Sequence, residues 1–276
     1  MMKKYLFALI VLLSVLLYTL GHRVNRIEVL RIGCECDYPP NNWEEDRETD
    51  SNAPIVNREG FYAEGYDIQI AKAVAEKIGA RLEVKKILWQ DLMPALQRRE
   101  IDAIFSGMLD TDERKARADF SDTYDYFETE YAIIVHKDSK YAQARKLNDF
   151  YGAVITGQAG TALDVLVEQV PGAIHVEPAD TFTELLDKLL NNDVDGIVIN
   201  VDTGEIYEKS HQDLLMVRFP KGKGFKLNFT GTCVGVRKKN DTLLRAINSA
   251  LSELSKRDRQ RIMDMTILRQ WENINI

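Results

Sequence analysis

Hydrophobic residues recur along this chain at two spacings, one typical of buried strands and one typical of amphipathic helices. Between residues 66 and 78 the apolar positions fall on one face of a helix, and Gly79 supplies its stop. A short helix is expected at 92–98. Apolar or β-branched runs predict strands at 27–32, 81–88 and 101–105. The resulting βαβαβ order predicts a parallel sheet covered by helices.

The same order restarts in the second half of the chain. The pattern predicts strands at 153–156, 174–177 and 194–199, with helices at 161–169 and 181–190. Segments 101–104 (Ile-Asp-Ala-Ile) and 194–197 (Val-Asp-Gly-Ile) echo each other at the same point of the two halves. Further along, strands are expected at 215–219 and 233–236, and helices at 241–255 and 257–271. We therefore expect an α/β protein with two similar lobes.

A polar, acidic stretch interrupts the first half at 41–60, and its pattern predicts a long loop. Asp46, Glu48 and Asp50 alternate there, which suggests a calcium loop. The match fails, because Ser51 and Asn57 stand where an EF-hand needs Gly and Glu. We expect a solvated loop and no metal.

The amino-terminal segment has the layout of an export signal. Lys3 and Lys4 precede an apolar run at 5–20, and the first acidic residue is Glu28. The segment 1–21 fits a signal peptide or a membrane anchor. Its length, just short of the usual span, favours cleavage. Either way the protein is expected to be exported, to the periplasm or to the extracellular face of the cell membrane.

Composition excludes several classes of protein. The 276 residues carry a net charge of −7, with 45% hydrophobic and 29% charged residues, so neither a disordered chain nor a nucleic-acid-binding surface is expected. Cys34, Cys36 and Cys233 are an odd number, so at least one thiol is left over, and the pairing of the others stays open. The four histidines show no ligand spacing, and no cofactor is implied.

No catalytic motif stands out. The sequence has no Gly-x-Ser-x-Gly elbow, no Walker loop and no His-Glu-x-x-His, which favours a binding protein over an enzyme. The segment 106–114 follows a predicted buried strand and opens a helix, with Thr111 as the natural N-cap. Arg114 lies in the first helical turn, where the helix dipole disfavours it. A carboxylate ligand would explain that position, and so would an ion pair with Glu113 or Asp110.

The matching crossover in the second half is 158–162. It also follows a strand and opens a helix, so its N–H groups are placed to bind the same anion from the other side. A plain turn and helix cap explains the same residues. Both interpretations stay open on the pattern alone.

Several segments, in their order and spacing, resemble one family. They are 65–71 (Gly-Tyr-Asp-Ile-Gln-Ile-Ala), Trp89 with 94–96, 101–104, and 107–122. The chain from 27 to 271 is similar to the polar amino-acid branch of the extracellular solute-binding proteins that serve ABC importers. The resemblance implies a periplasmic-binding-protein-like II fold: two lobes with a ligand cleft between them, joined by two hinge strands. Lobe 1 would comprise 27–130 and 230–276, lobe 2 would comprise 131–229, and the crossings would fall near 128–132 and 228–232.

The resemblance also implies roles for single residues. Arg114 matches the carboxylate-binding arginine and Gly107 a backbone contact. Tyr38 and Trp89 match the apolar walls around the ligand side chain, and Glu35 matches an acidic position that meets it in some relatives. The remaining expected ligand-binding residues are Thr161 and Ala162, which match the carboxylate clamp of the second lobe, together with Gln158, Leu109 and Asn200.

Two of these positions depart from the family pattern. Leu109 stands where a hydroxyl residue is usual, and Asn200 stands where an aspartate usually holds the ligand's ammonium group. Loss of a charge-assisted hydrogen bond weakens binding by about 1.5–3 kcal/mol unless another group compensates. Ala162, which also lacks a hydroxyl, points the same way. The ligand is therefore expected to be an amino acid or an analogue of one.

The function expected from the resemblance is capture of this solute by hinge closure. The partners would be the small ligand and a membrane permease, with the protein acting as a monomer and catalysing nothing. A membrane-tethered sensor remains an alternative. So does a dehydratase-type enzyme, in which Glu35, Asp110 and Asp202 would offer acid–base pairs.

Overall fold

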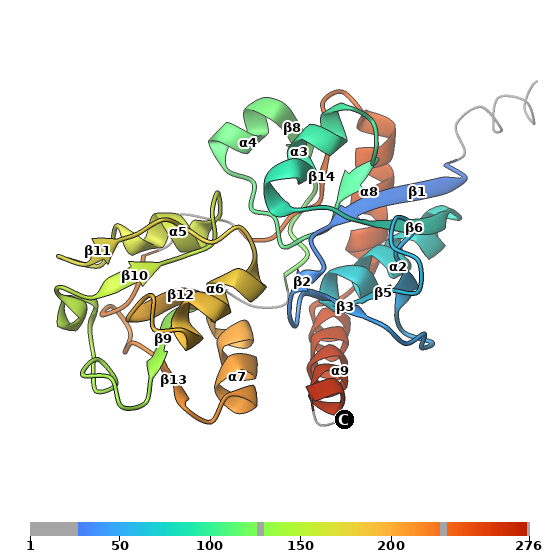
Figure 1. Cartoon of the computed structure of the whole chain (residues 1–276). Coiled ribbons are helices and arrows are strands. Elements are labelled where there is room, and N and C mark those ends of the chain that lie inside the picture. The colour runs from blue at the N-terminus through green and yellow to red at the C-terminus, as the bar shows by residue number, and fades with distance from the viewer. Residues whose placement is uncertain (1–26, 126–129, 227–230, 275–276) are drawn as a thin grey trace, which may run out of the picture.

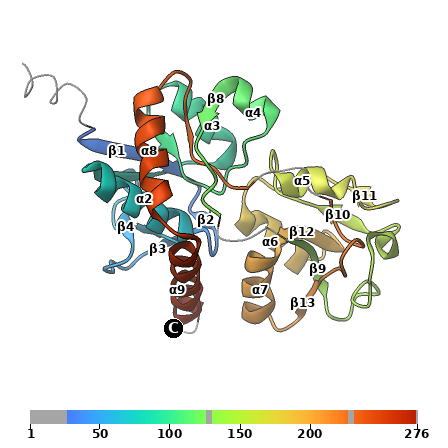
Figure 2. The ribbon, with the colours of Figure 1, turned by 180° about the vertical axis from the view of Figure 1, so that it is seen from behind.

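The computed structural model describes residues 27–125, 130–226 and 231–274, and these form two α/β lobes (Figures 1 and 2). Each lobe is built on one five-stranded sheet. We call lobe 1 the part formed by residues 27–125 and 231–274, and lobe 2 the part formed by residues 130–226. The predicted α/β fold class is confirmed.

The sheet of lobe 1 has the strand order β6-β1-β7-β14-β8. Its strands are β1 (Val29–Cys34), β6 (Arg81–Lys86), β7 (Ala103–Ile104), β8 (Ala118–Phe120) and β14 (Gly235–Arg237). Strands β6, β1 and β7 are parallel, and Ile32 lies opposite Val84 on one side and Ala103 on the other, with all three fully buried. Because these strands are parallel, their carboxyl ends meet at one edge of the sheet.

Lobe 1 has five helices among the described residues. They are α2 (Tyr66–Ile78), α3 (Trp89–Gln97), α4 (Asp112–Arg117), α8 (Asp241–Glu253) and α9 (Lys256–Ile274). Helix α2 has the predicted bounds and ends at Gly79, which adopts the left-handed conformation that glycine tolerates. Ile70 and Val74 of α2 and Ile247 of α8 are fully buried in one core, where the two helices pack together (Figure 2).

Lobe 2 repeats the arrangement around its own core. Its sheet has the order β11-β10-β12-β9-β13. The strands are β9 (Tyr131–His136), β10 (Val154–Thr156), β11 (Ile174–His175), β12 (Gly196–Asn200) and β13 (Leu214–Val217). The helices are α5 (Ala162–Val167), α6 (Phe182–Leu190) and α7 (Val201–Ser210), with a 3-10 turn at Leu147–Phe150. Strands β10, β11 and β12 are parallel as expected, whereas β9 runs antiparallel to β12 and β13.

The prediction of a long solvated loop at 41–60 is wrong in part. The segment contains β3 (Asn42–Glu45) and β4 (Ala53–Pro54), which join β2 (Asp37–Tyr38) and β5 (Tyr62–Glu64) in a four-stranded sheet. Trp43 and Ile55 are buried, at 5% and 3% exposure. Two apolar side chains among polar neighbours give no clear period, so burial against lobe 1 decides the structure rather than local propensity.

Helix α7 is not predicted by the sequence pattern. Its polar surface and the central Gly204 argue against a helix. In the structure Gly204 lies against Met216 of β13, and a side chain at position 204 would overlap the sulfur atom of that methionine. The glycine therefore allows close packing of helix on sheet, a tertiary effect that the local sequence does not reveal.

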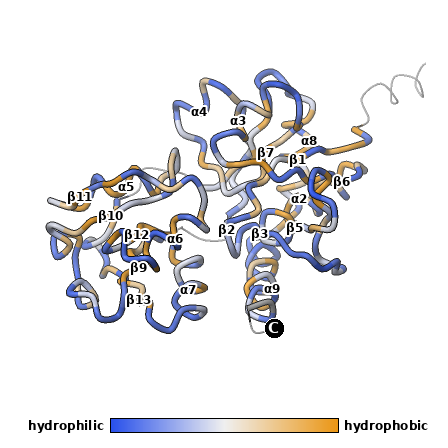
Figure 3. The backbone as a smooth tube through the Cα atoms, in the orientation of Figure 1, coloured by the Kyte–Doolittle hydropathy of each residue, from blue (hydrophilic) through white to orange (hydrophobic). Residues whose placement is uncertain are grey.

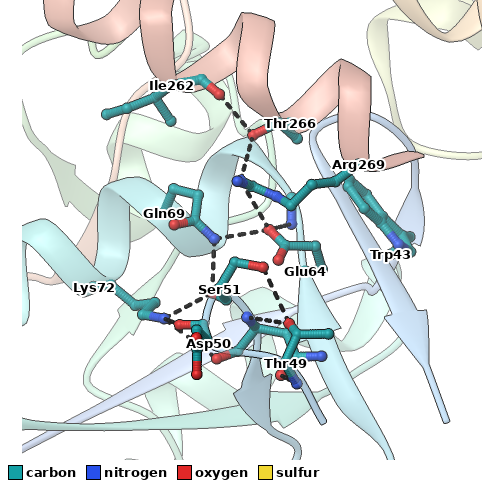
Figure 4. A network of polar contacts seen from close by, with 12 residues as sticks. Trp43, Thr49, Asp50, Ser51, Glu64, Gln69, Lys72, Ile262, Thr266 and Arg269 are labelled. Atoms are coloured by element: carbon teal, nitrogen blue, oxygen red, sulfur yellow. Dashed lines mark hydrogen bonds and ion pairs between the residues drawn. The ribbon is translucent and has the colours of Figure 1, made fainter. Parts of the chain in front are cut away.

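A polar network holds α9 on lobe 1 (Figure 4). Glu64 is buried, and its Oε1 accepts hydrogen bonds from Gln69 Nε2 at 2.7 Å and from the Gly65 N–H at 2.8 Å. Arg269 of α9 pairs with the same oxygen at 3.4 Å. At the end of this helix the Trp271 ring lies under Lys209 of α7, with Nζ 3.1 Å from the ring centroid. Helix α9 thus belongs to lobe 1 and contacts α7 of lobe 2 through this pair of side chains.

Some expectations fall on residues that the structure does not describe. These are the export segment 1–21, residues 128–129 of the first crossing and residues 228–230 of the second. Cys34, Cys36 and Cys233 are all buried and free. Within residues 27–125, 130–226 and 231–274, no helix combines the length and hydrophobicity needed to cross a membrane. Figure 3 agrees, since hydrophobic and hydrophilic positions are interspersed along the labelled helices.

Candidate ligand-binding cleft

A cavity lies between the two lobes, where the carboxyl ends of the central strands of lobe 1 face the helix starts of lobe 2. Its empty space is about 520 Å³, part of it open to solvent. The residues that line it are Glu35, Tyr38, Trp89, Ser106, Gly107, Leu109, Arg114, Tyr131, Gln158, Thr161, Ala162, Leu163, Phe182 and Thr232. Nine of the ten ligand-binding residues expected from the sequence are among them.

Arg114 enters the cavity from the first turn of α4. The cap of that helix forms as predicted, with the Arg114 N–H donating to Thr111 Oγ1 at 3.3 Å. The guanidinium donates to the carbonyl oxygens of Leu109 and Gly160, each at 2.9 Å. No carboxylate of the described residues forms an ion pair with Arg114. Burial lowers the pKa of its guanidinium, and the charge of Glu113 opposes that effect. The positive charge is therefore held in the cavity without a direct ion-pair partner among the described residues.

Trp89 and Arg114 of lobe 1 both donate hydrogen bonds to the same atom of lobe 2, the carbonyl oxygen of Gly160. Trp89 Nε1 donates to the Gly160 carbonyl oxygen at 3.1 Å, and the Arg114 guanidinium donates to the same oxygen. The guanidinium also lies over the Trp89 ring, 5.0 Å from its centroid. Gly160 has a φ of 68°, which turns its carbonyl toward lobe 1 at little cost for glycine. The predicted crossover at 158–162 therefore meets the predicted arginine across the cavity.

The start of α5 forms the lobe 2 side of the cavity. Thr161 is the N-cap, and its Oγ1 accepts from the Leu163 N–H at 3.1 Å while donating to the Gln158 carbonyl oxygen at 2.7 Å. Ala162 is the first helical residue. These bonds explain how a short polar segment holds a fixed shape next to the cavity.

Glu35 follows β1 and is 3% exposed. Its N–H donates to Ser106 Oγ at 3.1 Å, and its Oε1 accepts from Gln158 Nε2 at 2.5 Å. Burial, followed by the charge of Asp37, raises the pKa of Glu35 to about 8, against the opposing effects of Gln158 and Lys86. At neutral pH the carboxyl is therefore mostly protonated, and it can act both as hydrogen-bond donor and as acceptor.

Aromatic rings close one side of the cavity. Tyr38 stacks on Phe182 of lobe 2, with the centroids 4.3 Å apart and the planes at 14°. Gly107 has a φ of 62°, and a Cβ there would come within 2.8 Å of the Tyr38 ring. Glycine is therefore required at this position both by conformation and by the ring beside it.

Asn200 is the expected site residue that does not line the cavity. It lies at the end of β12, is 2% exposed, and leaves its Oδ1 without a hydrogen-bond partner among the described residues. It caps α7 without a side-chain bond. Its expected role toward the ligand's ammonium group therefore remains a prediction.

Five lining residues are missing from the sequence-based set: Ser106, Tyr131, Leu163, Phe182 and Thr232. Ser106 directly follows a predicted strand and precedes Gly107, so its position could have identified it. The helical pattern assigns Phe182 to the core, and the ring indeed lies in the core of lobe 2 while also facing the cavity. Tyr131 and Thr232 lie within the two predicted crossings, and nothing local distinguishes them.

Comparison with known proteins decides the family. Residues 30–265 match the model of the bacterial extracellular solute-binding proteins, family 3. The chain belongs to this family. Its members are extracellular proteins that bind solutes for transport. Among the described residues, no cluster of His, Cys, Asp and Glu side chains is arranged to hold a metal ion.

Individual family members show how far the similarity extends. The chain is 29% identical over 203 residues to the arginine-binding extracellular protein ArtP of Bacillus subtilis (strain 168), covering 73% of this chain and 76% of that protein. A solved structure of an ancestral arginine-binding protein bound to arginine is 30% identical, with a TM-score of 0.71, over 87% of this chain and 98% of the other. A solved structure of an ancestral arginine-binding protein bound to glutamine is 31% identical, with a TM-score of 0.70, over 86% of this chain and 96% of the other.

Proposed function

We propose that this protein captures an amino acid between its lobes and delivers it to the membrane permease of an ABC importer. One observation carries the proposal: the Arg114 guanidinium faces the cavity with two carbonyl partners and no carboxylate from the described residues. A desolvated charge without a direct ion-pair partner is costly. The carboxylate of an amino acid supplies that partner and can form two parallel bonds with the guanidinium.

The side chain of the ligand is constrained by Glu35. Among the described residues that line the cavity, Glu35 is the one acidic side chain. A ligand side chain that ends in N–H donors satisfies its carboxyl oxygens, and those of arginine and glutamine both do so. ArtP is named for arginine, and ancestral arginine-binding proteins were solved with arginine and with glutamine. We infer a nitrogen-terminated amino acid as the ligand class.

Binding would proceed by hinge closure. Trp89 and Arg114 of lobe 1 both bond to Gly160 of lobe 2, so the cavity exists in its present shape only when the lobes are together. A ligand that contacts both lobes binds the closed state more tightly and shifts the population toward it. We expect the ligand to be released unchanged. We also expect the protein to be an exported monomer whose segment 1–21 is removed.

A thermal-shift screen of ligand-free protein against the common amino acids tests the proposal, with calorimetry on each hit. A ligand at one hundred times its dissociation constant adds about 2.7 kcal/mol of stability. Agmatine, which is arginine without its carboxylate, serves as the matched control for an arginine hit. Binding of a free amino acid, with agmatine at least tenfold weaker, supports the proposal. Absence of any amino-acid hit, or equal affinity for agmatine, contradicts it.

A further inference from the structure

Asp37 of lobe 1 reaches across to a helix of lobe 2. Its Oδ2 accepts from the Thr183 N–H at 2.9 Å, and its Oδ1 accepts from Thr183 Oγ1 at 2.5 Å. Thr183 is the second residue of α6, and Asp37 belongs to the two-residue strand β2. The two residues belong to different lobes, so this contact exists only while the lobes are closed.

The helix itself leaves this N–H unsatisfied. Backbone N–H groups in the first turn of a helix have no partner within the helix. The N-cap Thr181 accepts from the Glu184 N–H, so the Thr183 N–H is left for another acceptor. A carboxylate at this end also interacts favourably with the helix dipole. Asp37 therefore makes a charge-assisted contact that opening of the cleft would exchange for water.

The two residues that follow Asp37 also contact lobe 2. Tyr38 stacks on Phe182, the first residue of α6. The Pro39 carbonyl oxygen accepts from Thr203 Oγ1 of α7 at 2.5 Å. Three consecutive residues of lobe 1 thus contact two helices of lobe 2. Asp37 is not among the cavity-lining residues, in contrast to Tyr38.

We propose that Asp37 is a positioning residue for closure: it stabilises the closed state through the first turn of α6 and so sets affinity without selecting the ligand. The proposal rests on the proposed function, since it takes hinge closure as the binding step. A contact present only in the closed state changes the fraction of closed protein, and apparent affinity scales with that fraction. Its removal must therefore weaken the binding of every ligand by the same factor.

The test compares Asp37→Ala, Thr183→Val and the double variant by calorimetry with two ligands of different affinity. The measurements are made at a pH well above the Glu35 pKa of about 8, because the charge of Asp37 raises that pKa and would otherwise change how Glu35 titrates. We expect Asp37→Ala to raise both dissociation constants by the same factor, about tenfold for a lost charge-assisted bond. Thr183→Val should raise the dissociation constants of both ligands by one smaller factor. The double variant should have the same dissociation constants as Asp37→Ala. Asp187→Ala, an exposed acid farther along α6, is the control and should change neither constant.

Small-angle X-ray scattering of the ligand-free variants gives a second readout. Asp37→Ala should increase the radius of gyration relative to wild type, whereas its thermal unfolding in the absence of ligand should change little. The proposal is overturned if wild type binds amino acids and Asp37→Ala binds them equally well, or loses one ligand much more than the other. If wild type binds no amino acid, the proposed function fails, and an unchanged radius of gyration would then reject the closing role separately.

Discussion

Glu35 Oε1 of lobe 1 accepts a hydrogen bond from Gln158 Nε2 of lobe 2 at 2.5 Å, and both side chains are almost fully buried. This bond joins the lobes at the wall of the cavity. Because burial raises the pKa of Glu35 to about 8, the carboxyl holds its proton at neutral pH in the empty cleft. The protonation state of Glu35 should therefore affect the binding of cationic ligands differently from that of neutral ones.

The first prediction concerns the pH dependence of binding. A guanidinium ligand pairs with ionised Glu35, and the ionised fraction falls about tenfold for each pH unit below the pKa. Affinity for arginine should therefore fall about tenfold per unit between pH 8 and pH 6, whereas affinity for glutamine should stay nearly flat. Isothermal titration calorimetry at several pH values, in buffers of different ionisation enthalpy, measures both the affinity and the proton released.

Glu35→Gln is the control for this pH prediction. The amide cannot titrate, so the slope for arginine should disappear, and arginine should bind more weakly than to wild type above pH 8. The raised pKa of Glu35 also determines whether folding stability rises or falls with pH. The folded protein holds this proton up to about pH 8, whereas the unfolded chain releases it near 4.5, so this stabilising contribution falls as pH rises between those values. A pH slope that survives in Glu35→Gln would assign it to another group.

The second prediction concerns Arg114. Arg114→Ala should weaken amino-acid binding by about 2–5 kcal/mol, because the ligand carboxylate would be left buried without its partner. Arg114→Lys keeps the charge but loses the two-pronged geometry, so it should recover only part of the loss. Lys115→Ala is the matched control, since Lys115 is exposed and pairs with Asp110 at 2.7 Å. Equal affinities of Arg114→Ala and wild type in calorimetry would show that Arg114 has only a structural role.

The sequence predicts the lobes and most of the cavity because local signals coincide there. Helix α2 has regular apolar spacing and a glycine stop, and its bounds match the structure at both ends. Arg114, Gly107 and Thr161 each lie where a predicted strand gives way to a helix, at the edge of a sheet where α/β proteins bind ligands. Position in the topology therefore predicts a binding edge for each lobe, and the family resemblance adds that the two edges face one cleft.

The features that escape prediction depend on distant residues. Helix α7 packs through Gly204 against Met216, and β3 is held by the burial of Trp43, and neither effect leaves a local period. The partner of Asp37 is 146 residues away and belongs to the other lobe. Contacts of this kind arise only when the lobes meet, so no sequence window contains them.

The third prediction uses two glycines with similar backbone conformations. Gly107 and Gly60 have φ values of 62° and 78°, so alanine at either should cost about 1 kcal/mol of stability. Only at Gly107 would the new Cβ press on a neighbour, the Tyr38 ring at 2.8 Å, whereas Gly60 has nothing within 4 Å. Gly107→Ala should therefore weaken ligand binding by about 1–3 kcal/mol through the displaced ring, and Gly60→Ala should leave it unchanged. Equal loss of ligand affinity in the two glycine variants would show that the position of the Tyr38 ring does not affect binding.

The last prediction concerns the attachment of α9 to lobe 1. Glu64 is 1% exposed, and Arg269 is the one residue that forms an ion pair with it among the described residues (Figure 4). Removing one partner of a buried pair leaves the other charge uncompensated. Arg269→Ala should therefore lower the free energy of unfolding by about 3 kcal/mol, the lower end for such pairs, because the guanidinium is partly exposed.

Denaturant unfolding of ligand-free protein checks this value against two further variants. Combining Arg269→Ala with Glu64→Gln should recover part of the loss, since the amide carries no charge and can still accept from Gln69 and from the Gly65 N–H. Arg261→Ala, an exposed arginine of the same helix, should change stability by less than about 0.5 kcal/mol. If the double variant were no more stable than Arg269→Ala, the loss of stability would come from the packing of the arginine side chain and not from the unpaired carboxylate of Glu64.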